Sequence, residues 1–151
     1  MPQCTLSTPL GHLTVTEENG ALVAVGFTDL PLSAPHTPLL CRAAREFSAY
    51  FERELREFSL PIAPLGTAFQ RSVWQAAREI PYGQTRTYGE IAAAIGRPGA
   101  ARAVGGALHR NPLLLVIPCH RILGADGTLT GFGCGIERKE FLLKLETNNL
   151  I

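Results

Sequence analysis

A helix–turn–helix pattern lies in residues 87–109, whose sequence is TYGEIAAAIGRPGAARAVGGALH. Thr87 and Glu90 have the spacing of a capping box, in which a hydroxyl and a carboxylate accept hydrogen bonds from free backbone N–H groups at the start of a helix. Gly96 suits the left-handed conformation that ends many helices, and Pro98 suits the first turn of a following one. The stretch therefore predicts a short helix, a tight turn and a second helix that begins at Pro98.

The second helix of this pair, over residues 98–109, carries almost no long side chains. Arg102 is its one long polar residue before His109, and most of the others are Ala or Gly. Reading base edges in the major groove requires several polar side chains, whereas small residues let a helix approach a narrow groove closely. From this helix alone two interpretations stay open: close packing against a neighbouring helix, and sequence-tolerant binding in the minor groove of double-stranded DNA.

The charge is split between the two parts of the chain. The 151 residues have a net charge of +1, but residues 1–66 hold four Arg against seven acids, a net of −3, and residues 67–151 hold ten Lys and Arg against six acids, a net of +4. Between Arg86 and Arg121, five arginines meet a single acid, Glu90. Charge alone favours a solvated basic surface. Combined with the small-residue helix, it favours a DNA-binding face.

The composition excludes several classes of protein. Hydrophobic residues make up 46% and charged residues 18%, values that exclude a disordered chain. The longest apolar runs, such as 113–117, are far shorter than the roughly 20 residues that cross a bilayer. The four cysteines form no C-x-x-C pair and no disulfide framework. We expect a soluble, cytoplasmic, monomeric protein without a leader, with reduced thiols and with no cofactor or metal.

The pattern of elements predicts an α/β fold with two domains, residues 1–64 and 65–151. The first domain begins as an antiparallel meander and continues into an amphipathic helix from Leu40 to near Glu57. A proline-containing linker follows over 59–66. The predicted strands of the meander are Cys4–Ser7, His12–Thr16 and Leu22–Phe27, the last two joined by the turn signal Asn19-Gly20.

The second domain is predicted to be mainly helical. A capping box at Thr67 opens a helix that Pro81 ends, before the helix–turn–helix. The apolar run 113–117 is short enough for a buried strand, which delivers the sequence Pro118-Cys-His-Arg121. A final amphipathic helix begins at Ile136.

Cys119 is the candidate for a reactive thiol. His120 and Arg121 follow it directly, and cationic or hydrogen-bonding neighbours favour the thiolate. Many cysteines are simply small buried hydrophobes, which is our interpretation of Cys4 and Cys41. A zinc site does not fit, because Cys119 and His120 are too close in sequence to chelate one ion comfortably.

The second domain resembles the O6-alkylguanine-DNA alkyltransferases over about residues 66–146. The first domain is compatible with the ribonuclease-H-like subdomain of that family, and the second with its winged-helix-like DNA-binding domain. The residues that carry the resemblance are Phe69-Gln70, Val73-Trp74, Ile80-Pro-Tyr-Gly83, Tyr88-Gly89, Arg102-Ala-Val-Gly105, Asn111-Pro112, Pro118-Cys-His-Arg121, Leu142-Leu143 and Glu146.

This resemblance implies DNA repair by direct reversal of damage. O6-alkylguanine, mainly O6-methylguanine, is flipped out of the duplex, and its alkyl group moves irreversibly to Cys119 in a single turnover. His120 would take the thiol proton through a water, oriented by Glu146, a residue that by itself would be interpreted as an exposed helix position. Arg102 would fill the vacated place in the stack. The other implied DNA-binding residues are Tyr88, Ala101 and Gly105.

The resemblance also implies a substrate pocket. Asn111 would hold a turn, Lys139 would brace the active-site loop, and backbone groups of Cys119, Ile122 and Gly133 would recognise the base. Two positions depart from the family pattern: Phe132 stands where Tyr is usual, and Cys134 where Gly is usual. A side chain at position 134 is expected to narrow the pocket against bulky alkyl groups.

Three other functions compete with repair. A non-catalytic sensor of alkylated DNA would share the fold but lack the acceptor cysteine, which Cys119 argues against. A helix–turn–helix regulator would show polar base-reading side chains, which residues 98–109 lack. A Cys-His hydrolase would draw its nucleophile and base from distant segments around a pocket.

Overall fold

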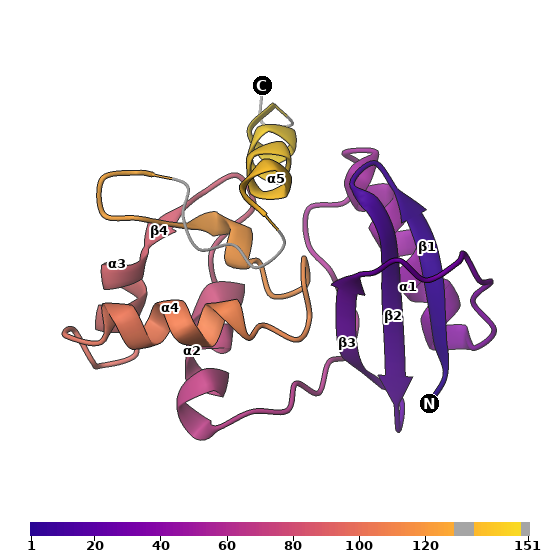
Figure 1. Cartoon of the computed structure of the whole chain (residues 1–151), viewed down its shortest axis with the longest axis horizontal. Coiled ribbons are helices and arrows are strands. Elements are labelled where there is room, and N and C mark those ends of the chain that lie inside the picture. Colours follow the sequence, from indigo (N-terminus) through magenta and orange to yellow (C-terminus); the bar gives the residue numbers. More distant parts are fainter. Residues whose placement is uncertain (129–134, 149–151) are drawn as a thin grey trace. The chain divides into compact units, whose positions relative to one another are not determined.

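The computed structural model describes residues 1–128 and 135–148, which form two compact units. Unit 1 comprises Met1–Leu65 and Pro112–Leu114, and unit 2 comprises Gly66–Asn111 and Leu115–Ile151 (Figure 1). Each unit is described separately below. No helix among the described residues is long and apolar enough to cross a membrane.

Unit 1 is built on a three-stranded antiparallel sheet in the order β1 (Gln3–Thr8), β2 (Gly11–Glu18) and β3 (Ala21–Phe27). Asn19 and Gly20 join β2 to β3 with φ angles of 52° and 79°, and two consecutive positive angles are typical of the hairpin turn whose twist matches the strands. The predicted meander is confirmed.

Helix α1 (Pro38–Phe51) packs on the sheet through an apolar stripe. Thr37 accepts a hydrogen bond from Leu40 N and so caps the first turn. The helix ends earlier than the predicted limit near Glu57, because Arg53 adopts a φ of 64°, a left-handed conformation that cannot continue a helix. The buried stripe consists of Leu40, Ala43, Phe47 and Tyr50.

Unit 2 is mainly helical, and its two predicted capping boxes are present. Thr67 and Gln70 satisfy each other's backbone N–H groups at the start of α2, and Thr87 and Glu90 do the same at the start of α3. The elements are α2 (Ala68–Arg78), β4 (Arg86–Thr87), α3 (Tyr88–Ala94), α4 (Ala101–His109), the 3-10 turn η1 (Cys119–Arg121), β5 (Ile122–Leu123) and α5 (Ile136–Asn148).

The turn between α3 and α4 differs from the prediction. Gly96 has the expected positive φ of 77°, but Pro98 does not open α4, which begins only at Ala101. Pro98 and Gly99 instead form the centre of a turn closed by a hydrogen bond from Ala100 N to Arg97 O at 2.9 Å. Proline fixes φ near the value that the second position of such a turn requires, so local turn chemistry shortens the helix.

The predicted strand over 113–117 is wrong, although all five residues are buried. Only the first part of the segment pairs with β3, through Val25 N to Pro112 O at 2.8 Å and Leu114 N to Val25 O at 3.0 Å. Leu115 then has a φ of 73°, which interrupts an extended strand. Cys119 is therefore presented by a turn and the first residue of η1 rather than by a strand end.

Trp74 anchors the helical core of unit 2. Its side chain is buried, and its indole N–H donates to Ala107 O at 2.9 Å, which ties α2 to α4. Gly66 lies against the ring: a Cβ at this position would come within 2.5 Å of Trp74 Cη2. The resemblance to the alkyltransferases includes Trp74, and the structure gives this residue a packing role.

Gly66→Ala should lower the free energy of unfolding by about 1–3 kcal/mol, because the added methyl group overpacks the Trp74 ring. Gly99→Ala is the matched control: nothing lies within 4 Å of its added Cβ, and we expect a change below about 1 kcal/mol. Urea unfolding followed by Trp74 fluorescence measures both. Equal stability of the two variants would contradict the packing described here.

Candidate active site

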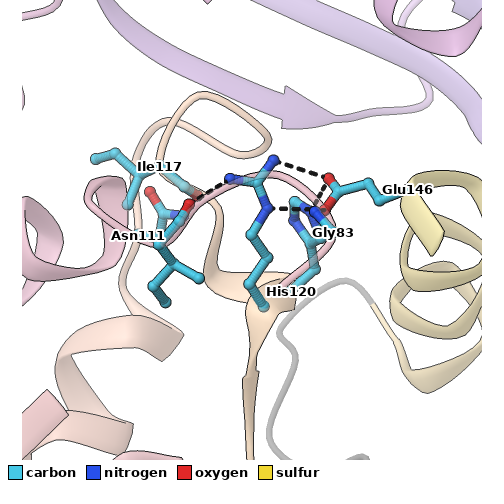
Figure 2. Close-up of polar contacts among 7 residues, drawn as sticks. Gly83, Asn111, Ile117, His120 and Glu146 are labelled. Atoms are coloured by element: carbon cyan, nitrogen blue, oxygen red, sulfur yellow. Dashed lines mark hydrogen bonds and ion pairs between the residues drawn. The ribbon is translucent and has the colours of Figure 1, made fainter. Parts of the chain in front are cut away.

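Cys119 is a buried thiol with an amide donor beside it. Its side chain is 6% exposed, and Asn111 Nδ2 donates both to Cys119 Sγ at 3.2 Å and to Ile117 O at 2.8 Å. Figure 2 shows Asn111 beside Ile117, whose carbonyl oxygen fixes the amide. An N–H aimed at sulfur stabilises the thiolate more than the thiol. Asn111, predicted only to hold a turn, therefore lies directly against the nucleophile.

His120 and Glu146 form a buried pair. His120 Nε2 lies 2.7 Å from Glu146 Oε2, and each side chain is only 1% exposed (Figure 2). Helix α5 presents Glu146 on its buried face, so the prediction from its isolated position, an exposed helix residue, would be wrong. The other ring nitrogen, His120 Nδ1, is buried and has no hydrogen-bond partner among the described residues.

Arg121 holds the same carboxylate from a second side. Its Nε donates to Glu146 Oε1 at 2.8 Å and its Nη2 to Glu146 Oε2 at 3.0 Å, a bidentate pair, while Nη1 donates to Ile80 O at 2.8 Å. The guanidinium carbon also lies 5.6 Å from the centre of the Tyr82 ring. Sequence reasoning placed Arg121 only as a cation next to Cys119. The signal that could have found this pairing is the motif Ile80-Pro-Tyr-Gly83, which encloses the guanidinium.

These contacts set the charges of the pair. Burial lowers the pKa of His120, although the hydrogen bond and charge of Glu146 act in the opposite direction. Burial alone would raise the pKa of Glu146, but the hydrogen bonds and charges of His120 and Arg121 outweigh it and hold this pKa far below its ordinary value. The pair therefore consists of a neutral imidazole and an ionised carboxylate at neutral pH.

Lys139 places a buried ammonium group near the thiol of Cys119. Its side chain is 1% exposed, and its Nζ donates to Ile122 O. Burial lowers the pKa of Lys139, while the charge of the Cys119 thiolate raises it. The same attraction, taken from the side of the sulfur, stabilises the thiolate. The lysine that was predicted to brace a loop is thus also an electrostatic partner of Cys119.

The predicted DNA-binding residues belong to α3 and α4, and two of them, Tyr88 and Gly105, lie close together. Tyr88 is the first residue of α3, and its ring lies close to Gly105 of α4, where a Cβ would be 3.8 Å from the ring. Ala101 and Arg102 lie in the first turn of α4, and the Arg102 side chain is exposed.

The pocket residues are only partly described. Ile122 is fully buried at the start of β5, next to Cys119 and Lys139. The predicted pocket residues Phe132, Gly133 and Cys134 lie outside the described residues. In the described part of the chain, no three His, Cys, Asp or Glu side chains are arranged to hold a metal ion.

Two family models match this chain. One is described as "6-O-methylguanine DNA methyltransferase, DNA binding domain" and matches residues 68–148, and the other is the ribonuclease-like domain of the same methyltransferases and matches residues 3–64. The chain belongs to the O6-methylguanine-DNA methyltransferase family. The resemblance deduced from the sequence is confirmed, and so is the mixed α/β fold.

Individual relatives agree with this assignment. The methylated-DNA–protein-cysteine methyltransferase of Methanosarcina barkeri is 61% identical over 108 residues, which cover 72% of this chain and 68% of that protein. The protein of the same name from Haemophilus influenzae is 46% identical over 147 residues, covering 91% and 82%. The crystal structure of Mycobacterium tuberculosis OGT in complex with DNA has a TM-score of 0.88 at 45% identity, with 96% of this chain and 92% of that chain covered.

Acid should weaken this methyltransferase fold in two stages. The pKa of His120 is lower in the folded protein than its ordinary value of 6.5, so below this pH the unfolded chain binds a proton more readily than the folded protein does. The same holds for Glu146 below about pH 4.5. Each group makes the unfolding free energy fall with acidification, by up to about 1.4 kcal/mol per pH unit within its window. Urea titrations at pH 8, 6 and 5 measure the slope of the first stage, and titrations at pH 4 and 3 measure the slope of the second.

The control for the first stage is a pair of histidine variants. His120→Gln keeps an N–H donor toward Glu146 but does not titrate, so it should flatten the slope between about pH 6.5 and 5. His109→Gln, at an exposed position of α4, should leave the slope unchanged. A slope that is the same in both variants would show that His120 does not carry the effect.

Proposed function

We propose that the protein repairs O6-methylguanine in DNA by moving the methyl group to its own Cys119. The observation that carries this proposal is the surroundings of the thiol: Asn111 and Lys139 stabilise a sulfur anion, and His120 follows with one ring nitrogen bound to Glu146. Membership of the family supplies the reaction class. In this proposal unit 2 binds the DNA and accepts the alkyl group, and unit 1 is the scaffold.

The first step removes the thiol proton. Because ionised Glu146 can only accept hydrogen bonds, His120 Nε2 must carry a hydrogen, and in the neutral ring Nδ1 is then the basic nitrogen. Within the described part of the chain Nδ1 has no hydrogen-bond partner, which supports a role as the proton acceptor. A bridging water, which the family resemblance implies, would pass the proton of Cys119 to it.

The second step is an in-line displacement at the methyl carbon. The thiolate electron pair forms the new S–C bond, the C–O6 bond breaks, and its electron pair goes to O6 of guanine, which takes up a proton from solvent and remains in the DNA strand as the normal base. The product is a thioether. A thioether is a poor leaving group and is not easily hydrolysed, so we infer one turnover per protein molecule.

Access to the base requires extrusion from the duplex. Flipping a nucleotide costs a few kcal/mol of stacking and pairing, and in our proposal the exposed Arg102 fills the vacated place while Tyr88 contacts the extruded nucleotide. The small residues Ala101 and Gly105 would let α4 approach the minor groove. Such contacts depend little on the base sequence of the DNA, which suits a lesion that can occur next to any base. We expect a monomer to be sufficient.

Transfer of a labelled methyl group tests the chemistry directly. After reaction with excess O6-methylguanine duplex, mass spectrometry should find one added methyl group per protein, on Cys119 alone. Cys119→Ala should abolish transfer and retain binding to the duplex. Cys41→Ser, a half-buried thiol of unit 1, is the control and should transfer normally. Binding without transfer by the parent protein would favour the sensor of alkylated DNA instead.

If Arg102 fills the place that the flipped base vacates, its loss should affect duplex DNA and the free base differently. Arg102→Ala should slow transfer from duplex DNA by about tenfold or more, since part of the flipping cost is no longer offset. Transfer from the free O6-methylguanine base should stay within about twofold, because no base has to leave a stack. Arg110→Ala, an exposed residue at the other end of α4, is the matched control. An equal loss of transfer rate on both substrates would contradict this role of Arg102.

A further inference from the structure

Arg121 is a buried cation that contacts Glu146, Ile80 and the ring of Tyr82. Its side chain is 8% exposed, it binds both oxygens of Glu146, and its remaining Nη1 donates to Ile80 O. Gly83 N adds a further, longer donor to Glu146 Oε1 at 3.4 Å. The carboxylate therefore receives donors on both oxygens, and both Arg121 and His120 are among these donors.

His120 lies next to an ion pair, Arg121 and Glu146, whose net charge is zero. The groups that act on its imidazole are Glu146 and Lys139 on α5 and the adjacent Arg121 on η1. Arg121 already binds the carboxylate of Glu146 as an ion pair, so a proton added to His120 would give this buried cluster an additional positive charge beside the ammonium group of Lys139. Such a charge is costly in a buried site.

We propose that Arg121 is a positioning residue that keeps Glu146 ionised and thereby keeps Nδ1 of His120 free to accept the proton of Cys119. This inference rests on the proposed methyl transfer for its consequence, but the protonation state that it assigns exists in the free protein. Arg121 itself touches neither the thiol proton nor the methyl group in this account. It acts through the carboxylate and the ring.

Removal of the guanidinium takes from Glu146 the cation that binds both of its oxygens, so the His120–Glu146 pair then takes up a proton near neutral pH. If the proton binds the ring, both ring nitrogens carry hydrogen. If it binds Glu146, the carboxylic acid donates to Nε2, and the ring hydrogen must move to Nδ1. Nδ1 loses its acceptor lone pair in both cases, so the outcome does not depend on how the two groups share the proton.

The nitrogen-15 shifts of the histidine rings in the free protein test this directly. In the parent protein at pH 7, His120 Nδ1 should be unprotonated, and in Arg121→Met it should carry hydrogen. Arg121→Lys, which keeps the charge but not the bidentate geometry, should restore the unprotonated state. The control is Arg97→Met, since Arg97 also lies 5.6 Å from an aromatic ring, that of Phe69, but is exposed. An unprotonated Nδ1 in Arg121→Met would overturn the proposal.

A double variant keeps the test valid if Arg121→Met does not fold. Arg121→Met with Glu146→Gln removes both charges at once, and the amide oxygen introduced by the second substitution can still accept a hydrogen bond from Nε2. Nδ1 should then be unprotonated at pH 7, as in the parent. A purely structural role of Arg121 predicts that removing a second partner damages the site further. A protonated Nδ1 in the folded double variant would therefore overturn the proposal.

The consequence for transfer is a displaced pH profile. If the protonation midpoint of Arg121→Met lies about one unit above pH 7, transfer at pH 7 should be about tenfold slower than in the parent, with recovery to within about threefold of the parent at pH 9. An equal loss at every pH would contradict the role of Arg121 in transfer. If the parent protein transfers no methyl group, the proposed function fails, while the nitrogen-15 result still decides the protonation of His120.

Discussion

The carboxylate of Glu146 is the constraint on which the active site depends. It lies on the buried face of α5 and receives hydrogen bonds from His120 and Arg121, both in the single turn η1. An ionised carboxylate is expensive to bury unless such donors surround it. The pairing therefore fixes α5 against η1, and it determines where Cys119, the first residue of that turn, can lie.

His120 and Cys119 are adjacent in sequence but lie in different electrostatic environments. The imidazole of His120 is neutral because it is buried, and because the cations Arg121 and Lys139 oppose the effect of Glu146. Cys119, in contrast, has the amide of Asn111 and the ammonium group of Lys139 to stabilise negative charge. A base that is free of its proton next to a thiol that is stabilised as an anion is the arrangement that nucleophilic chemistry needs. Family membership identifies the electrophile as an alkyl group on guanine.

The sequence predicted the local features of the fold, since these depend on residues that are close together in the chain. The capping boxes at Thr67 and Thr87 and the hairpin at Asn19-Gly20 formed as predicted, because each depends on residues within four positions of one another. The family resemblance supplied Cys119, His120 and Glu146, and the structure brings the last two together.

The remaining features depend on contacts that no local pattern encodes. Leu113–Ile117 is apolar enough for a strand, but only its start pairs with β3 before Leu115 turns the chain. Arg121 was predicted as a neighbour of Cys119 because adjacency in sequence was the only available evidence. Its true partners, Ile80 and Glu146, are 41 and 25 residues away.

In the proposed reaction the alkyl group ends on the sulfur of Cys119 and stays there. A time course with excess O6-methylguanine duplex tests this when repaired guanine and methylated Cys119 are both measured. Repaired guanine should stop at one equivalent per protein, and the amount of S-methylated Cys119 should match it throughout. Continued repair beyond one equivalent, or repair without methylation of Cys119, would contradict the proposed reaction.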